Sequence, residues 1–325
     1  MKRLETITQE PIYTDTPFPE CHASTVALCG KTLVAAWFGG THEKHPDVGI
    51  WLSHKPLRSK SAWSAPVRVA KVDETAHWNP VLFYGPDKTL HLWFKAGPTI
   101  PHWKTWTTTS RDSGKTWSAP RELIPGDDTG GRGPVKNKPI LLSDGALLAG
   151  ASSEQGTWEA FFDRSSDKGK SWQRTTNLDR TALGEKHGII QATLWESAPG
   201  KLHALLRSSC GYCPRTDSDD NGRTWKPVYD SKLPNNNSGI DLARLPDGTL
   251  ALAHNPVVGN WAARTPLRIA LSFDNGITWP SFVDIETEPK MEFSYPAIIP
   301  LGKNELAVTY TWKRKQIHFW HGKLV

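Results

Sequence analysis

Polar side chains recur in this sequence at the ends of short apolar segments. Five of these residues stand just before an apolar segment: His22, Asn79, Lys138, Gln191 and Tyr295. Five others stand at the end of the apolar segment that follows in a unit: Lys95, Glu154, Arg207, Asn255 and Tyr310. Lysine and arginine bind anionic groups, carboxyl and imidazole groups transfer protons, and a tyrosine oxygen can transfer a proton or attack carbon. One such residue could simply line a wet channel. Ten that converge favour a ligand-binding site.

The segments that carry these residues come in pairs with the pattern of β-hairpins. The first members span residues 25–28, 81–83, 140–142, 193–195, 242–245 and 297–299, and the second members span 33–38, 90–95, 147–151, 202–207, 250–255 and 306–310. Turn residues such as Gly, Pro and Asp join the two members of each pair. If the six hairpins run in the same sense, the ten polar side chains meet at one end of the sheets.

A second pattern gives the period of these hairpins. Four segments share the order Ser, Asp, Gly, Ser or Thr, and Trp, at residues 110–117, 165–172, 218–225 and 272–279. Neighbouring copies lie about 54 residues apart, and residues 53–66 contain a fifth, degenerate copy. Six units of this length account for the chain, so the sequence predicts one domain over residues 1–325.

The repeated segment has the chemistry of a tight turn. An Asp side chain accepts hydrogen bonds from nearby backbone N–H groups, and Gly adopts backbone angles that other residues avoid. The Ser and Thr hydroxyls add bonds to the same turn, and the Trp anchors it on an apolar surface. We therefore expect each copy to join the two outer strands of a four-stranded sheet and to be structural.

The motif S-x-D-x-G-x-S/T-W resembles the Asp box, or BNR repeat, of the sialidase (neuraminidase) superfamily. The resemblance covers the whole chain and implies an all-β, six-bladed β-propeller with four-stranded antiparallel blades. The last unit begins at Phe293 and has only three strands. Residues 4–12 can supply its fourth strand, which would close the ring between the two chain ends.

The resemblance also implies roles for particular residues. Tyr295 stands where the sialidase nucleophile is expected, Arg207 and Arg264 match two carboxylate-binding arginines, and Asp47 occupies the loop of the acid/base. Two positions depart from the family: His22 stands where the first arginine belongs, and Gln191 stands near the place of the tyrosine's glutamate partner. Glu292, close to Tyr295 in sequence, could substitute for that glutamate.

The favoured function is an exo-acting glycoside hydrolase that acts on an acidic sugar at a glycan non-reducing end. The alternative is a uronate-specific lyase, in which His22 and Tyr295 act as base and acid while Arg207 or Arg264 binds the carboxylate. A third reading is a non-catalytic carbohydrate-binding protein. We expect Asn79, Trp78, Lys95, Lys138, Glu154, Asn255 and Tyr310 to contact the sugar.

Tryptophan is unusually frequent in this chain, with 16 residues. Trp78, Trp103, Trp106 and Trp261 lie in or near the loops expected at the mouth of the channel. Each could stack on a sugar or pack between blades.

Composition excludes several classes of protein. The net charge of +6 is spread along the chain, which gives no indication of nucleic-acid binding. No apolar run is long enough to cross a membrane, and no leader-like stretch begins the sequence, so a cytoplasmic location is expected. The four cysteines are interpreted as ordinary thiols. The segment with His42, Glu43 and His45 resembles half a metal site, but no further ligand lies nearby in the sequence, so it is interpreted as a polar loop. No metal or cofactor is expected, and the sequence predicts no oligomeric state.

Overall fold

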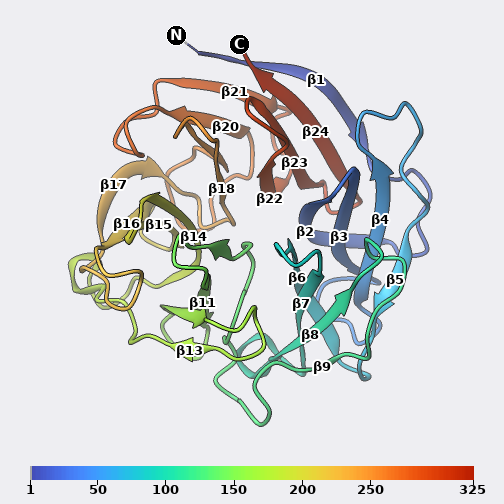
Figure 1. The fold of residues 1–325 in the computed structure, drawn as a ribbon, viewed down its shortest axis with the longest axis horizontal. Helices are drawn as coiled ribbons and strands as arrows, with labels where there is room; N and C mark the ends of the chain where they lie inside the picture. The colour runs from blue at the N-terminus through green and yellow to red at the C-terminus, as the bar shows by residue number, and fades with distance from the viewer. Residues whose placement is uncertain (1) are drawn as a thin grey trace.

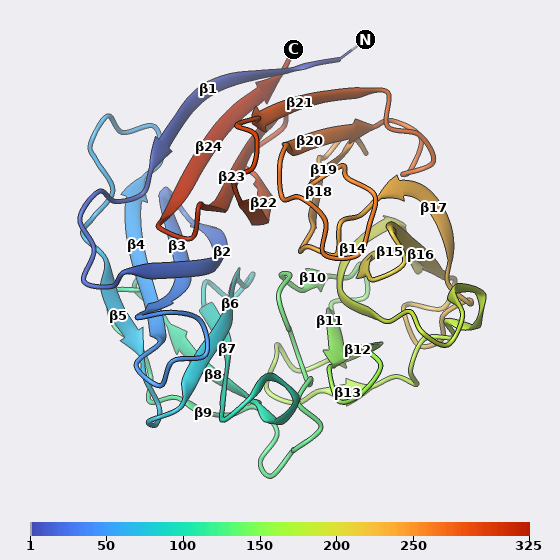
Figure 2. The same ribbon diagram turned by 180° about the vertical axis from the view of Figure 1, so that it is seen from behind.

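The computed structural model describes residues 2–325, which form six four-stranded antiparallel sheets around a central axis (Figure 1). This arrangement confirms the six-bladed β-propeller that the sequence predicts. In each blade the first strand lies nearest the axis and the fourth lies at the rim, except in the last blade, whose rim strand is the N-terminal one (Figure 2).

The strands follow the hairpin pattern of the sequence. They are β1 (Leu4–Pro11); β2 (Glu20–Cys29), β3 (Thr32–Gly40), β4 (Gly49–Pro56) and β5 (Val67–Ala70); β6 (Ala76–Tyr84), β7 (Leu90–Gly97), β8 (Lys104–Ser110) and β9 (Arg121–Glu122); β10 (Ile140–Leu141), β11 (Leu147–Ser153), β12 (Glu159–Ser165) and β13 (Gln173–Arg174); β14 (Ile189–Ala198), β15 (Lys201–Ser208), β16 (Tyr212–Ser218) and β17 (Tyr229–Pro234); β18 (Asp241–Arg244), β19 (Leu250–His254), β20 (Leu267–Ser272) and β21 (Ser281–Glu286); and β22 (Phe293–Pro300), β23 (Glu305–Trp312) and β24 (Gln316–Leu324). Two single-turn 3₁₀ helices, η1 (Ile100–His102) and η2 (Thr181–Leu183), lie in the connections.

The N-terminal strand closes the ring. β1 pairs antiparallel with β24, from Leu4 opposite Leu324 to Pro11 opposite His318, and the last sheet has the order β1-β24-β23-β22. The two chain ends therefore lie side by side (Figure 1). The expected closure by residues 4–12 is confirmed, although the strand ends one residue earlier.

The Asp boxes are rim turns between the third and fourth strands of their blades. In the first clean copy, Asp112 Oδ1 accepts bonds from the backbone nitrogens of Lys115 and Thr116 at 3.1 and 2.9 Å, and Oδ2 accepts one from Thr116 Oγ1 at 2.7 Å. The Thr116 bond is the main cause that lowers the pKa of Asp112. Gly114 has φ +86°, which an L side chain rarely adopts, and its carbonyl accepts the indole N–H of Trp117 at 3.0 Å.

The entry to the innermost strand is irregular in four blades. Register shifts follow His22, Trp78, Ile190 and Ser294, and the next residue in each case has a positive φ: Ala23, Asn79, Gln191 and Tyr295, at 54°, 43°, 55° and 51°. Such bulges re-aim side chains. The sequence aligned His22 with Asn79, Gln191 and Tyr295 at the start of the innermost strands. The bulges correct this alignment, because the residue of the first blade that matches these three is Ala23.

Apolar faces pack between neighbouring blades. Val34 and Ile50 of the first blade, for example, belong to one buried cluster with Leu82 and Leu92 of the second. Among residues 2–325, no helix has the length and apolar character needed to span a bilayer.

Candidate functional site

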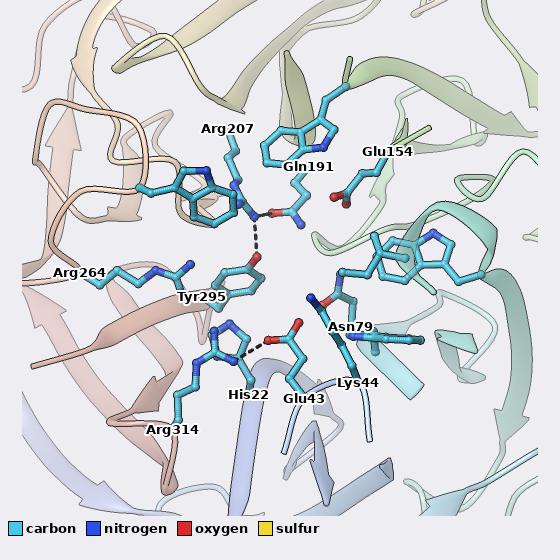
Figure 3. Close-up of a pocket in the computed structure, with 15 residues that line it drawn as sticks. His22, Glu43, Lys44, Asn79, Glu154, Gln191, Arg207, Arg264, Tyr295 and Arg314 are labelled. Carbon is cyan, nitrogen blue, oxygen red and sulfur yellow. Dashed lines mark hydrogen bonds and ion pairs between the residues drawn. The ribbon is translucent and has the colours of Figure 1, made fainter. Parts of the chain in front are cut away.

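A cavity of about 220 Å³ opens where the innermost strands begin, at the centre of the ring (Figure 3). Its walls come from all six blades and their loops. The lining residues are His22, Glu43, Lys44, Trp78, Asn79, Ile100, Trp103, Glu154, Trp158, Gln191, Arg207, Trp261, Arg264, Tyr295 and Arg314. Eight of them are predicted site residues: His22, Trp78, Asn79, Glu154, Gln191, Arg207, Arg264 and Tyr295.

The Tyr295 hydroxyl lies at the centre of this cavity (Figure 3). It accepts a hydrogen bond from Arg207 Nη1 at 2.5 Å, and the same nitrogen donates to Gln191 Oε1 at 3.2 Å. Arg207 Nε donates to Asn237 Oδ1 at 2.8 Å, so the guanidinium is held from two sides. A charged donor at this distance stabilises negative charge on the tyrosine oxygen.

Two further arginines share one carboxylate beside Tyr295. Arg264 Nη1 donates to Glu292 Oε1 at 2.7 Å, and Arg314 Nε donates to the same oxygen at 3.1 Å. These cations outweigh the effect of burial, so the pKa of Glu292 is lowered. Glu292 is thus an ionised partner of the arginines and does not line the cavity.

Arg314 was not anticipated from the sequence, which indicates an incomplete set of carboxylate-binding arginines. It lies in the turn between β23 and β24, and its Nη1 donates to Glu43 Oε2 at 2.6 Å. With Arg207 and Arg264 it gives the cavity three guanidinium groups (Figure 3). The basic run of residues 313–315 directly after a strand that ends at the mouth was the available signal.

His22 is buried against the tyrosine. Its ring centroid lies 4.1 Å from that of Tyr295, and neither ring nitrogen has a hydrogen-bond partner among the described residues. Burial, with Arg314 and the other nearby cations, lowers the pKa of His22 well below its usual value. The imidazole is therefore neutral at pH 7.

A buried lysine, Lys136, lies near the tyrosine ring and was not anticipated from the sequence. Lys136 donates to the carbonyl oxygens of Ile240, at 3.1 Å, and Pro296, and its nitrogen lies 5.9 Å from the Tyr295 ring centroid. Burial lowers the pKa of Lys136 to about 7.

Aromatic side chains form two parts of the cavity wall. Trp78 and Trp103 meet edge to face with centroids 5.5 Å apart, and Trp158 and Trp261 do the same at 6.0 Å. The Arg207 guanidinium carbon lies 5.1 Å and 5.4 Å from the Trp158 and Trp261 centroids. Trp261 is 62% exposed, which leaves its face free at the mouth.

Trp158 was not anticipated, since it lies in no recognisable motif. Trp106, which the sequence placed near the mouth, packs in β8 against the buried cluster of the first two blades instead.

Two predicted polar residues lie outside the cavity on the mouth side. Asp47 is held in its own loop, where its carboxylate accepts from Thr41 Oγ1 at 2.6 Å and lies 2.8 Å from His45 Nδ1. Lys95 is fully buried, donates to the Arg132 carbonyl at 2.9 Å, and has a pKa lowered to about 7 by burial.

Three more predicted residues make contacts within the fold. Lys138 Nζ lies 2.8 Å from a carboxylate oxygen of Asp241 in the channel, and Asn255 donates to the Phe293 carbonyl at 2.9 Å. The Tyr310 hydroxyl donates to Glu286 at 2.6 Å. These contacts hold the three side chains within the fold, and none of the three lines the cavity.

The described residues contain no cluster of three or more His, Cys, Asp or Glu side chains that could hold a metal ion. The rings of His42 and His45 lie 5.2 Å apart within the loop of Glu43.

Solved structures of low sequence identity share this fold. A protein of unknown function from Dyadobacter fermentans has a TM-score of 0.81 at 17% identity, with 99% of each chain covered. The NanB sialidase from Streptococcus pneumoniae has a TM-score of 0.74 at 12% identity, over 97% of this chain and 70% of the other. A leech intramolecular trans-sialidase has a TM-score of 0.75 at 15% identity, over 98% and 70%. No curated protein matches the chain by sequence.

The family comparison agrees with the repeat and the fold. The family described as BNR repeat-like domain matches residues 31–308, which is most of the chain. The resemblance to the sialidase superfamily, first seen in the Asp boxes, thus extends to the blades and their order. The chain belongs to the BNR repeat-like domain family, and its propeller fold is similar to that of the solved sialidases.

Proposed function

We propose that this protein is an exo-acting glycosidase of the sialidase superfamily that removes an acidic sugar from a glycan non-reducing end. The observation that carries the proposal is that Arg207, Arg264 and Arg314 line one cavity together with Tyr295, whose hydroxyl accepts a bond from Arg207. Guanidinium groups recognise carboxylates through paired, directed hydrogen bonds. The solved sialidase structures of the same fold agree with an acidic sugar as the ligand.

The size and walls of the cavity suit one terminal sugar. Its volume of about 220 Å³ is small for a ligand site, which favours a chain end over the middle of a polysaccharide. Trp158 and Trp261 offer apolar faces, Trp78 and Trp103 are buried in the cavity wall, and Asn79 and Gln191 offer amides for the sugar hydroxyls.

Tyr295 is the proposed nucleophile. A bulge at the start of β22 positions its ring, and Arg207 donates to its oxygen at 2.5 Å. Gln191 replaces the carboxylate that the family places near this tyrosine, so the stabilisation of negative charge falls to Arg207.

A second candidate function, β-elimination on a uronate, is favoured by His22. Its imidazole contacts Tyr295, makes no hydrogen bond among the described residues and lies 3.9 Å through Nδ1 from Glu292 Oε1, so a ring nitrogen is free to accept a proton from a carbon next to a carboxylate.

Product analysis on a panel of acidic glycans tests both functions. Release of a free acidic sugar without new ultraviolet absorbance supports the glycosidase. The absorbance of an unsaturated uronate would support the lyase. Binding without turnover of any glycan would favour the carbohydrate-binding protein.

A further inference from the structure

Two carboxyl groups line the cavity within residues 2–325, and they differ in their surroundings (Figure 3). Glu43 Oε2 accepts a hydrogen bond from Arg314 Nη1 at 2.6 Å and forms an ion pair with it. Glu154 follows directly after β11 and has no hydrogen-bond or ion-pair partner in the described part of the chain, and its side chain extends into the cavity.

The other acidic residues near the centre are not available as proton donors. Asp47, where the family resemblance places the acid, accepts hydrogen bonds from the Thr41 backbone and hydroxyl and does not line the cavity. Those bonds, together with His45, outweigh its slight desolvation and lower the pKa of Asp47. Glu292 is ionised between Arg264 and Arg314.

The surroundings of Glu154 raise its pKa above the usual glutamate value. Burial is the main cause that raises its pKa, and the charge of Glu43 acts in the same direction across the cavity. Arg207 and Lys95 act in the opposite direction without cancelling the shift. Carboxyl groups whose surroundings push their pKa values apart are the usual arrangement for separate acid and base roles.

We propose that Glu154 is the general acid that protonates the oxygen of the leaving group, in place of the first-blade aspartate of the sialidases. This inference rests on the proposed glycosidase function and adds a catalytic residue to it. The third blade, which carries Glu154, lies across the ring from the sixth, which carries Tyr295 (Figure 1). The two groups can thus approach a bound sugar from different sides.

The first step balances with Glu154, Tyr295 and solvent water. The bond from the anomeric carbon to the leaving oxygen breaks, and that oxygen keeps the electron pair and takes the Glu154 proton. The Tyr295 oxygen, whose negative charge Arg207 stabilises, forms the new bond to the anomeric carbon and releases its proton to water. In the second step water attacks that carbon and gives a proton to Glu154, while the tyrosine oxygen leaves and takes a proton from water.

The test compares leaving groups in the Glu154→Gln variant. The probes are N-acetylneuraminic acid linked to methylumbelliferone, which leaves without a proton, and the same sugar linked to lactose, which needs one. We expect kcat on the lactose compound to fall by roughly 10²–10⁴-fold, and kcat on the methylumbelliferyl compound to fall far less. Equal losses on both compounds, or none, would overturn the assignment.

Two further variants sharpen this comparison. Glu159→Gln makes the same change in the same blade at a residue that pairs with Arg180 outside the cavity, and it should behave as wild type. Asp47→Asn examines the acid that the family resemblance predicts. If Asp47→Asn, and not Glu154→Gln, shows the dependence on leaving group, the proposal is wrong.

A measurement without substrate separates this proposal from the proposed function. Carboxyl NMR of the free protein, with the Glu154 signal assigned by its loss in Glu154→Gln, should give a titration midpoint above the usual glutamate range. A midpoint in or below that range would overturn the proposal even if wild-type turnover is found. Failure of the wild-type protein to cleave any acidic glycoside would instead overturn the glycosidase function.

Discussion

The Tyr295 hydroxyl can be removed without disturbing the ring that carries it. Tyr295→Phe keeps the contact with His22 and loses only the bond from Arg207. We expect normal folding and binding but a loss of turnover on the order of 10²-fold or more. Tyr310→Phe is the matched control, because its hydroxyl bonds to Glu286 outside the cavity. Near-normal turnover of Tyr295→Phe would reduce Tyr295 to a packing residue and leave His22 as a candidate.

Arg207 should distinguish charged from neutral ligands. Its guanidinium contacts Tyr295, Gln191 and Asn237 through two nitrogens, and a lysine ammonium has one. Arg207→Lys should weaken binding of N-acetylneuraminic acid by about 10-fold or more, the scale of a lost charge-assisted bond, and its methyl ester far less. Calorimetry on the two ligands measures the difference. Equal weakening of both would remove the assignment of Arg207 to the carboxylate.

At the scale of residues, the sequence best predicted which side chains line the cavity where the end of a strand fixes their position. Tyr295, Gln191 and Arg207 fall in the cavity because the hairpin pattern places them at its mouth. Loop residues are different, since contacts with neighbouring groups set the direction of their side chains. Asp47 bonds to Thr41 and His45 and does not line the cavity, whereas Glu43 pairs with Arg314 and does. No periodic pattern in the sequence encodes those contacts.

At the scale of elements, the Asp-box turn should contribute stability and not affinity. Asp220 accepts bonds from the backbone of Arg223 and Thr224 at 3.0 and 2.9 Å. Asp220→Ala should lower the free energy of unfolding by roughly 1–3 kcal/mol and leave affinity per folded molecule unchanged. Asp219→Ala, which removes only exposed pairs with Lys201 and Lys226, should leave the free energy of unfolding nearly unchanged. Lost affinity with unchanged melting of Asp220→Ala would contradict a structural role.

The turns were predictable because Asp and Gly signal them directly, whereas the bulges were not. Each of these bulges contains one residue at positive φ, a conformation that glycine adopts most readily. Here Ala23, Asn79, Gln191 and Tyr295 occupy it, so nothing in the sequence distinguishes the bulged position. The alignment of His22 was therefore wrong by one residue, although its side chain still lines the cavity.

At the scale of the whole molecule, the repeat predicted the number of blades because one period of the sequence is one sheet. The closing blade breaks the period, since its outer strand comes from the other end of the chain. Arg314 lies in that blade, which is one reason why the repeat gave no counterpart for it.

The ring closure should be essential to the stability of the whole propeller. Removal of residues 2–11 deletes β1 and exposes β24 as an unpaired edge, and it also removes the bond of Gln9 to Tyr310 at 2.9 Å and that of Thr6 to Trp320 at 2.9 Å. With several hydrogen bonds lost at about 1 kcal/mol each, the urea midpoint should fall markedly or the protein should aggregate. A synthetic peptide of residues 2–11, added to the truncated protein, should restore the midpoint, and a scrambled peptide of the same composition should not. An unchanged midpoint after truncation would show that the blades hold together without this strand.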